Sequence, residues 1–277
     1  MLYKLIPFSA FSGVAGWAEK QKIKSKLARK LLFGSFARVF GCNMDEATKP
    51  IDEFSSFGEF FSRPLKPGVR SFEKIDGIVS STDGKVLHYG QVHFNDSGAV
   101  FPEQVKGSLY KLSDLIGAES AKSFPGDKGR SIYYCTVYLA PGDYHRFHSP
   151  ANIKIESVES FSGEVLSVAP LMMKLVPHLL CINERKAING KWKHGRISIV
   201  PVGAANVGSI IINGCIKPLQ KISIGDEIGR FELGSTVVYI LEAPSNFSWN
   251  ISAGQSIKMG QPLLSAPIQK RSWFNWF

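Results

Sequence analysis

Residues 231–238 read Phe-Glu-Leu-Gly-Ser-Thr-Val-Val, and this stretch decides how the fold is interpreted. After the serine the residues favour a β-strand, so Ser235 stands where a strand begins. Because Gly234 has no Cβ, the backbone can bend there and leave its carbonyl open to attack by the Ser235 hydroxyl. The serine lacks the Gly-x-Ser-x-Gly setting on a strand-to-helix turn, which disfavours an ordinary α/β-hydrolase. The stretch therefore predicts strain at the peptide bond that joins Gly234 to Ser235.

Two other segments place polar, reactive side chains next to turns. Residues 80–85 (SSTDGK) contain Asp83, and residues 140–150 (APGDYHRFHSP) contain His145 and His148. With Ser235 they supply an acid, imidazoles and a hydroxyl, which are the parts of an activated serine nucleophile. A Ser-His-Asp hydrolase that leaves its own backbone intact is one alternative. A metal pair at the two histidines lacks a third obvious ligand, so we expect no metal site.

The N-terminal region is predicted to contain an amphipathic helix. Over residues 17–40 apolar side chains recur every four residues, and the polar side carries several Lys and Arg with a single Glu. Near an acidic lipid surface each such cation is worth about 1 kcal/mol. Residues 1–48 are therefore predicted to associate with a membrane, although a helix packed on the body with a solvated basic face is the alternative. The apolar positions are Ile23, Leu27, Leu31, Leu32, Phe36 and Phe40.

After Pro50 the pattern changes to short apolar runs separated by Gly, Asp and Asn turns. Strands are predicted over residues 132–140, 153–161, 197–202, 209–212 and 237–241, and one helix over residues 109–117. The fold class is therefore α+β, with N-terminal helices and a single β-rich catalytic domain over residues 49–277.

Composition narrows the classes of function. With 277 residues, 44% hydrophobic and 20% charged, the chain is an ordinary globular protein and not a disordered or fibrous one. A net charge of +10 favours an anionic partner, and 19 Phe with 5 Trp favour lipid over nucleic acid, for which no motif is visible. A non-enzymatic, membrane-bound carrier or binding module is a further alternative, because residues 254–263 around Lys258 faintly resemble the swinging-lysine hairpin of biotinyl and lipoyl domains.

The three reactive segments occur in an order that resembles phosphatidylserine decarboxylase proenzymes of the prokaryotic type. The matching motifs are Asp83-Gly84, residues 143–148 (DYHRFH) and residues 233–236 (LGST). Residues 57–67 (FGEFFSRPLKP) and 260–263 (GQPL) also match, so the similarity covers nearly the whole chain.

The resemblance implies an enzyme that makes its own prosthetic group. Ser235 attacks the Gly234 carbonyl, the resulting ester undergoes β-elimination, and the chain divides into residues 1–234 and 235–277. The new N-terminal dehydroalanine loses ammonia and becomes a pyruvoyl group, so no outside cofactor is needed. Carried over by motif position, His148 is the general base for this cut, and Asp83 orients and stabilises its imidazolium.

The second reaction implied is the decarboxylation of phosphatidylserine to phosphatidylethanolamine in phospholipid biosynthesis. The substrate amine forms an imine with the pyruvoyl carbonyl, which accepts the electron pair released with carbon dioxide. His145 then returns a proton to the α-carbon. The expected partners are phosphatidylserine, an anionic membrane surface and the two cleaved chains as a heterodimer, dimerised again by family analogy. We expect peripheral attachment to the cytoplasmic side of the cell membrane.

Overall fold

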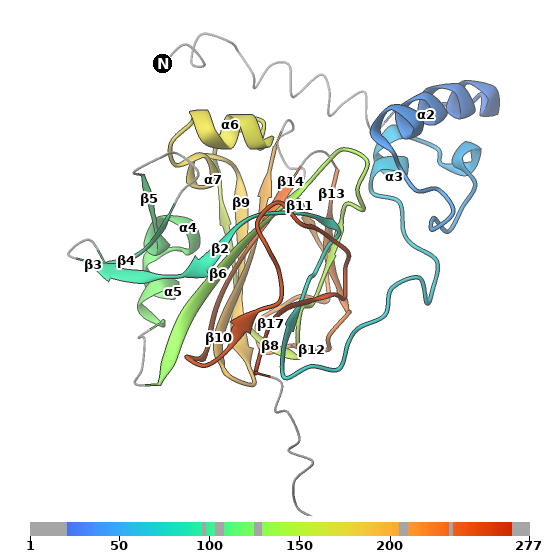
Figure 1. The fold of residues 1–277 in the computed structure, drawn as a ribbon. Helices are drawn as coiled ribbons and strands as arrows, with labels where there is room; N and C mark the ends of the chain where they lie inside the picture. Colours follow the sequence, from blue (N-terminus) through green and yellow to red (C-terminus); the bar gives the residue numbers. More distant parts are fainter. Residues whose placement is uncertain are drawn as a thin grey trace, which may run out of the picture.

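The computed structural model describes residues 21–95, 98–102, 108–124, 129–204, 210–232 and 235–267. At its centre lies an eight-stranded sheet in which every neighbouring pair is antiparallel (Figure 1). In spatial order the strands are β12 (Lys221–Ile222), β8 (Ile153–Phe161), β9 (Arg185–Trp192), β10 (Gly195–Gly203), β14 (Ser235–Pro244), β6 (Arg130–Leu139), β2 (Gly84–Gln91) and β16 (Ser256–Ile257).

Strand β14 occupies an inner position in this sheet. It pairs along its whole length with β6 and along most of it with β10, so that Ser235 lies opposite both Leu139 and Gly203. Every residue of β14 except Pro244 is buried. A strand covered on both faces requires an almost continuous apolar run, which residues 237–241 provide. The strand predicted there is confirmed, and it extends further because polar residues at its ends are buried as well.

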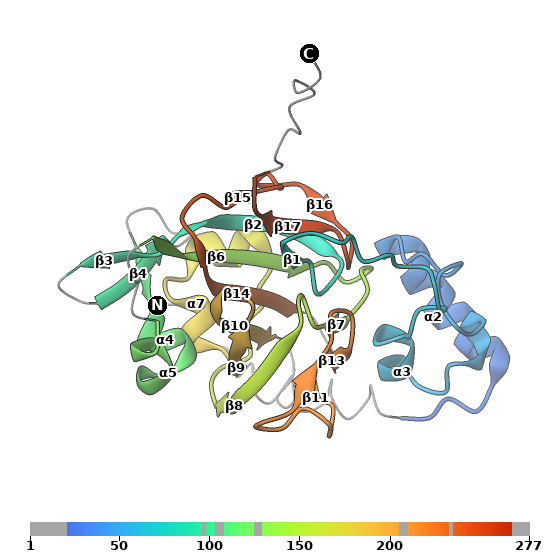
Figure 2. The ribbon, with the colours of Figure 1, turned by 90° about the horizontal axis from the view of Figure 1, so that it is seen from below.

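Two small sheets cover one face of the central sheet (Figure 2). Val237 and Tyr239 of β14 belong to the hydrophobic core on this face, together with Phe147 and Leu263 from the small sheets. One small sheet contains β1 (Gly77–Val79), β17 (Pro262–Ser265) and β15 (Ser248–Trp249), and the other contains β11 (Ile210–Ile212), β13 (Glu227–Phe231) and β7 (Arg146–His148).

Short helices cover the opposite face, where Val238 and Ile240 pack with Leu112 and Leu179. The helix predicted over residues 109–117 is only partly right, because its first three residues form a strand in which Tyr110 alone is buried. This alternation has the period of a strand. The elements on this side are β3 (His93–Asn95), β4 (Gly98–Pro102), β5 (Leu109–Lys111), α4 (Leu112–Ile116), α5 (Ala118–Lys122), α6 (Pro170–Leu175) and α7 (Leu179–Ile182).

The N-terminal elements form a helical segment beside the sheets: α2 (Lys26–Phe40), η2 (Ile51–Glu53) and α3 (Phe57–Phe61). Helix α2 begins after Ser25, whose side chain accepts a hydrogen bond from the Ala28 amide, so the helix starts later than the pattern predicts. The Phe33 ring stacks on that of Phe60 at 5.0 Å, which holds α2 to α3. Residues 1–20 of the predicted membrane segment lie outside the described residues.

The β-rich α+β architecture is therefore confirmed. Within the described part of the chain, none of the helices has the length and apolar character needed to cross a bilayer.

Candidate active site

The predicted reactive segments meet at one end of the central sheet. Ser235 opens β14 opposite Leu139, the last residue of β6, and the loop that carries His145 follows directly after β6. The His145 carbonyl accepts a hydrogen bond from the Phe231 amide at 2.8 Å, and the His148 amide donates to the Ser81 carbonyl at 2.8 Å. Residues far apart in sequence are thus brought to the start of the inner strand.

Ser235 is fully buried, and its hydroxyl has no hydrogen-bond partner among the described residues. A buried hydroxyl usually finds such a partner, and one without a partner is available for chemistry. Gly234, the predicted donor of the scissile carbonyl, lies outside the described residues.

The protonation of His148 follows from its two contacts. Its Nδ1 lies 2.9 Å from the Gly225 carbonyl oxygen, which can only accept, so Nδ1 carries the hydrogen. In the neutral ring Nε2 is therefore the acceptor, and it lies 2.8 Å from the Tyr144 hydroxyl. Burial lowers the pKa of His148 below its ordinary value, which keeps the ring neutral near pH 7. A neutral imidazole with a fixed tautomer is suited to act as a base through Nε2.

His145 has the same tautomer in a more enclosed place. Its Nδ1 lies 2.9 Å from the Asp143 carbonyl oxygen, and its Nε2 is buried without a partner among the described residues. The Phe61 ring covers the imidazole, with 4.0 Å between ring centroids. Burial is the main reason that the pKa of His145 falls to about 3, and the positive charge of Arg63 lowers it further. Before His145 can donate a proton from Nε2, it must first take one up.

Asp83 lies in a charged cluster that its own sequence motif does not indicate. Its carboxylate accepts hydrogen bonds from Arg70 at 2.6 and 3.2 Å, from Lys258 at 3.0 Å and from the Met259 amide at 2.8 Å. Glu46 also pairs with Arg70 at 2.7 Å. Although burial by itself lowers it, hydrogen bonds to Glu46 and Asp83 raise the pKa of Arg70 above its usual value. Lys258, considered above as a carrier lysine, is thus a partner of Asp83.

Asp83 does not reach His148 through any hydrogen bond between described residues. Gly225 and Tyr144 hold the imidazole instead, and the Asp83 charge acts on it at longer range. This charge raises the pKa of both His148 and His145, in opposition to burial. Tyr144 and Arg70 were missed because neither belongs to a triad pattern. The available signal was that a buried carboxylate needs cationic or amide partners.

An apolar cavity of about 270 Å³ adjoins the Ser235 end of the sheet. Tyr138 and Ala204 line it and are next in sequence to Leu139 and Gly203, the two residues opposite Ser235. Its other walls come from the helical segment and two loops, through Phe36, Phe40, Phe57, Phe61, Pro141, Ser167, Val168 and Ala169. Phe61, whose ring covers His145, is one of these residues, so the cavity reaches the wall of the predicted catalytic histidine. An apolar cavity there suits a substrate with hydrocarbon chains.

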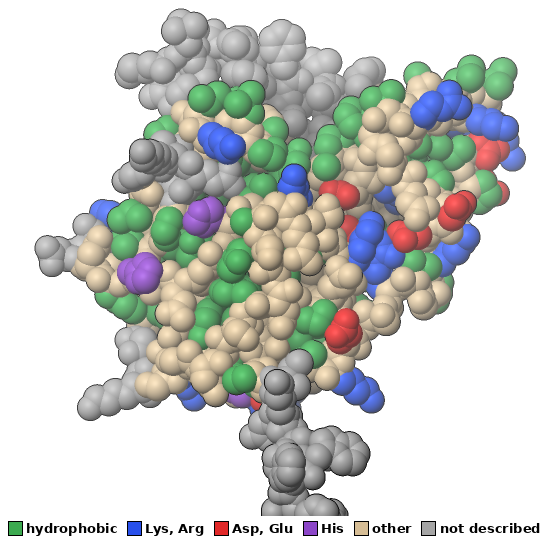
Figure 3. All heavy atoms as spheres, viewed as in Figure 1, with side chains coloured by type: hydrophobic (Ala, Val, Ile, Leu, Met, Phe, Trp, Pro, Cys, Tyr) green, Lys and Arg blue, Asp and Glu red, His purple; other side chains and the backbone are tan. Residues whose placement is uncertain are grey.

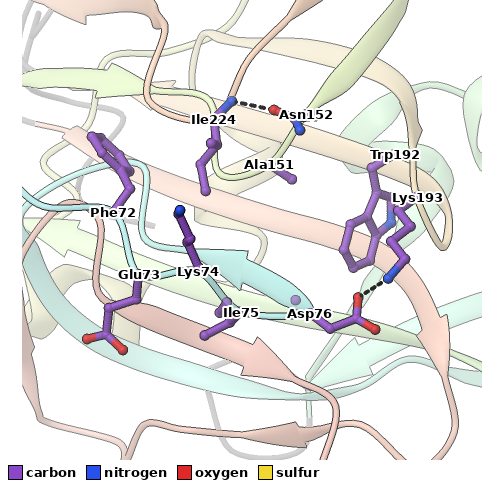
Figure 4. Close-up of a pocket in the computed structure, with 11 residues that line it drawn as sticks. Phe72, Glu73, Lys74, Ile75, Asp76, Ala151, Asn152, Trp192, Lys193 and Ile224 are labelled. Atoms are coloured by element: carbon purple, nitrogen blue, oxygen red, sulfur yellow. Dashed lines mark hydrogen bonds and ion pairs between the residues drawn. The ribbon is translucent and has the colours of Figure 1, made fainter.

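A larger cavity of about 530 Å³ lies elsewhere, between residues 72–77 and Trp192 (Figure 4). Trp192 ends β9, whereas the Ser235 end of the sheet adjoins the start of that strand, where Arg185 pairs with Val202. Asp76 in this cavity pairs with Lys193 at 2.7 Å. None of the predicted catalytic residues lines it. Among the described residues no group of three or more His, Cys, Asp or Glu side chains could hold a metal ion.

Comparison with known proteins identifies the family. The family model for phosphatidylserine decarboxylase matches residues 57–265. The chain belongs to the phosphatidylserine decarboxylase family. A mitochondrial phosphatidylserine decarboxylase proenzyme of Caenorhabditis elegans is 36% identical over 284 residues, covering 95% of this chain and 73% of the relative. The corresponding Rattus norvegicus proenzyme is 35% identical over 303 residues, with the same coverage of 95% and 73%.

A mitochondrial phosphatidylserine decarboxylase proenzyme 1 of Schizosaccharomyces pombe is 32% identical over 346 residues, covering 89% of this chain and 78% of the relative. The family resemblance predicted from the three reactive segments is therefore confirmed. The matched residues include Asp83, His145, His148 and Ser235.

Proposed function

We propose that this protein converts phosphatidylserine to phosphatidylethanolamine and carbon dioxide, using a pyruvoyl group that it makes from Ser235. The observation that carries the proposal is the position of Ser235, which is buried at the start of the inner strand, at the end of the sheet where residues 140–148 hold two neutral histidines. An apolar cavity lined by Phe61 adjoins His145 at the same end. The family of proenzymes to which the chain belongs supports the same reaction.

Self-cleavage begins when the Ser235 hydroxyl attacks the Gly234 carbonyl. The unprotonated Nε2 of His148 takes the hydroxyl proton, and Gly225 keeps that ring in the required tautomer. The peptide bond becomes an ester, and loss of the α-hydrogen of residue 235 then expels the Gly234 carboxylate. The dehydroalanine left at position 235 hydrolyses to a pyruvoyl group and ammonia.

Decarboxylation uses the pyruvoyl group as the electron sink for the bond that loses carbon dioxide. No described residue bonds to Nε2 of His145, so this nitrogen can take up a proton and later deliver it to the substrate α-carbon. The substrate enters as an ammonium ion and must lose a proton before its nitrogen can react. His145 is therefore both the acceptor of a proton and its donor.

Asp83 has two roles in this proposal. Its negative charge favours the protonated state of His145 and His148. Each proposed step passes through that state while the histidine carries the transferred proton. Asp83 also joins the two products of the cut, because it lies in the large chain while Lys258 and Met259 lie in the small one.

The membrane side of the molecule is proposed to be the end that carries α2 and α6. Leu27 and Leu31 of α2 are 67% and 62% exposed, and Leu171 and Leu175 of α6 are 68% and 64% exposed. Figure 3 shows hydrophobic side chains over these two helices at the upper edge of the molecule. Residues of α2 and residues just before α6 also line the apolar cavity. Exposed apolar side chains with nearby lysines suit the surface of an anionic bilayer.

The deciding experiment is a denaturing mass spectrum of the active protein. Two pieces are expected, and the smaller one has 277 − 234 = 43 residues with no free α-amino group. Activity is measured as conversion of phosphatidylserine to phosphatidylethanolamine. Active protein that remains one uncut chain would contradict the proposal, and labelling of that chain at Ser235 by a fluorophosphonate would favour a serine hydrolase.

A further inference from the structure

Arg63 differs from the other buried or half-buried arginines near the site. Arg63 is 3% exposed, yet among the described residues its Nε and Nη1 have no hydrogen-bond partner and it forms no ion pair with a carboxylate. By contrast, Arg70 pairs with Glu46 and Asp83, and Arg146 pairs with Glu227 at 3.0 Å. The negative charge of Asp143 acts on Arg63 without a direct ion pair between the two side chains. Burying a charge without a directly bonded counterion is costly. Arg63 therefore has both charge and donors available for a ligand.

The position of Arg63 places this charge beside the reacting groups. Its Nη2 donates to the Gly142 carbonyl at 2.7 Å and to the Asp143 carbonyl at 3.3 Å. The Asp143 carbonyl is also the partner of His145 Nδ1, so Arg63 and His145 share one acceptor. The neighbouring Pro141 and Phe61 line the apolar cavity. Arg63, His145 and Ser235, whose buried polar atoms lack a partner in the described part of the chain, thus belong to the same end of the sheet.

The chemistry of the substrate indicates which group this charge would meet. The phosphatidylserine headgroup carries a phosphodiester and a carboxylate, both anions, and guanidinium binds either through paired N–H donors. The carboxylate loses its negative charge as it leaves as carbon dioxide. A cation bound to it would therefore stabilise the bound substrate more than the transition state, which slows the reaction. The phosphodiester keeps its charge throughout the reaction. A cation bound to it therefore stabilises the substrate and the transition state equally and does not raise the barrier.

We propose that Arg63 binds the phosphodiester of the substrate headgroup through Nε and Nη1 while Nη2 holds the loop of His145. This inference rests on the proposed function. It makes Arg63 a determinant of substrate binding for an anionic glycerophospholipid. The Phe60 ring, whose centroid lies 5.9 Å from the Arg63 guanidinium carbon, also contacts the side chain.

The test compares Arg63→Met and Arg63→Lys with the wild-type enzyme on water-soluble dihexanoyl phosphatidylserine. Dihexanoyl phosphatidylethanolamine, which keeps the phosphodiester and lacks the carboxylate, serves as a product inhibitor. Arg63→Met should raise both the KM for substrate and the inhibition constant of the product by the same factor, about 10- to 100-fold. Arg63→Lys should recover part of the loss. Lys66→Met, which removes an exposed charge three residues away, is the matched control and should change neither constant.

Two results would overturn the inference. A raised KM with an unchanged inhibition constant would assign Arg63 to the carboxylate, and a lower kcat with both constants unchanged would leave it only a role in holding the loop. Completed self-cleavage reports that the variant has folded. If Arg63→Met does not fold, wild-type enzyme is assayed with the neutral methyl phosphotriester analogue, which should bind weaker by the same factor; equal binding overturns the inference. A wild-type enzyme that converts no phosphatidylserine would instead refute the proposed function.

Discussion

The Tyr144 hydroxyl lies 2.8 Å from His148 Nε2, and the two rings stack with 5.7 Å between their centroids. Because Nδ1 of His148 donates to the Gly225 carbonyl, the tyrosine must be the donor in this pair. Tyr144 therefore occupies the nitrogen that we propose as the base, and in the proposed cut the Ser235 hydroxyl would have to replace it. Burial also raises the pKa of Tyr144, so the phenol stays protonated and cannot act as the base itself.

This arrangement separates the effects of two substitutions on self-cleavage. His148→Ala removes the base and should slow the cut by about 10² to 10⁴, leaving mostly uncut chain on a denaturing gel. Tyr144→Phe leaves the ring and its Gly225 anchor in place, and the cut should remain within about tenfold of the wild-type rate. Complete processing of His148→Ala would remove the assigned base, and a block as strong in Tyr144→Phe would assign the proton transfer to the phenol.

His145 should act only after the cut. In His145→Ala we expect normal fragments but decarboxylation reduced by about 10² or more, because no other described group offers an unpaired ring nitrogen there. The measurement is phosphatidylethanolamine formed per cleaved chain. His88→Ala, at a half-buried histidine on β2 paired with Tyr134, is the control that should leave both reactions intact. Full activity in His145→Ala would refute the assignment.

Asp83 should matter for stability as well as for the cut. Asp83→Asn keeps the size of the side chain but leaves Arg70 without one of its two carboxylate partners, and breaking a buried pair costs about 3–5 kcal/mol. Both a lower melting temperature and slower processing are expected. Lys258 is 53% exposed, so Lys258→Met should lower the melting temperature much less. Equal losses in the two variants would mean that Arg70 is not the main partner.

The two buried histidines should make the protein less stable in mild acid. Their pKa values are lowered by burial, to about 3 for His145, so below pH 6.5 the unfolded chain binds protons that the folded chain does not. The contribution of the two neutral histidines to the free energy of unfolding is fully present above pH 6.5. It decreases as the pH falls below 6.5, by up to about 1.4 kcal/mol per pH unit for each histidine. Urea unfolding of uncut Ser235→Ala between pH 7.5 and 5 measures the slope. Adding His145→Gln should make it shallower; an identical slope would contradict the burial argument.

Membrane attachment should depend on the exposed leucines of α2. Leu27→Glu with Leu31→Glu puts charges on its apolar surface and should weaken binding to vesicles containing phosphatidylserine by at least about tenfold. Turnover of dihexanoyl phosphatidylserine should be unchanged, since neither side chain lines the cavity. The double substitution Glu119→Gln with Lys122→Gln, at an exposed ion pair on α5, is the control. Unchanged sedimentation with vesicles would place the membrane contact elsewhere.

Much of the fold could be predicted because the strands are marked by simple patterns. Strand β8 covers the predicted residues 153–161, where buried Ile153 and Ile155 alternate with exposed Lys154 at the start of the strand and β-branched residues favour extended backbone. The start of α2 was missed because apolar spacing continues through residue 23, whereas the helix is capped by Ser25. Local periodicity indicates that an element exists, and its ends depend on hydrogen bonds.

The site residues were predicted from motifs, but their contacts could not be. Nothing near Asp83 in the sequence indicates that Arg70 and Lys258 pair with it, because one reaches it from a loop and the other from a turn 175 residues away. Nor does the His-x-x-His spacing show that two backbone carbonyls fix both tautomers. These contacts depend on how the small sheets and the helical segment pack at the end of the central sheet. The catalytic roles of Asp83, His145 and His148 remain predictions.

The inner position of β14 has a consequence for the life of the processed enzyme. The 43-residue product would supply β14 to β17, with its first strand held between β6 and β10. The fragments could come apart only if the whole sheet melts. Unfolding by heat or urea would then separate two unlinked polypeptides. Refolding of the mature enzyme should therefore be a second-order process whose rate falls on dilution. The uncut Ser235→Ala chain should refold at a rate independent of concentration. After the cut, the enzyme can no longer refold as a single chain.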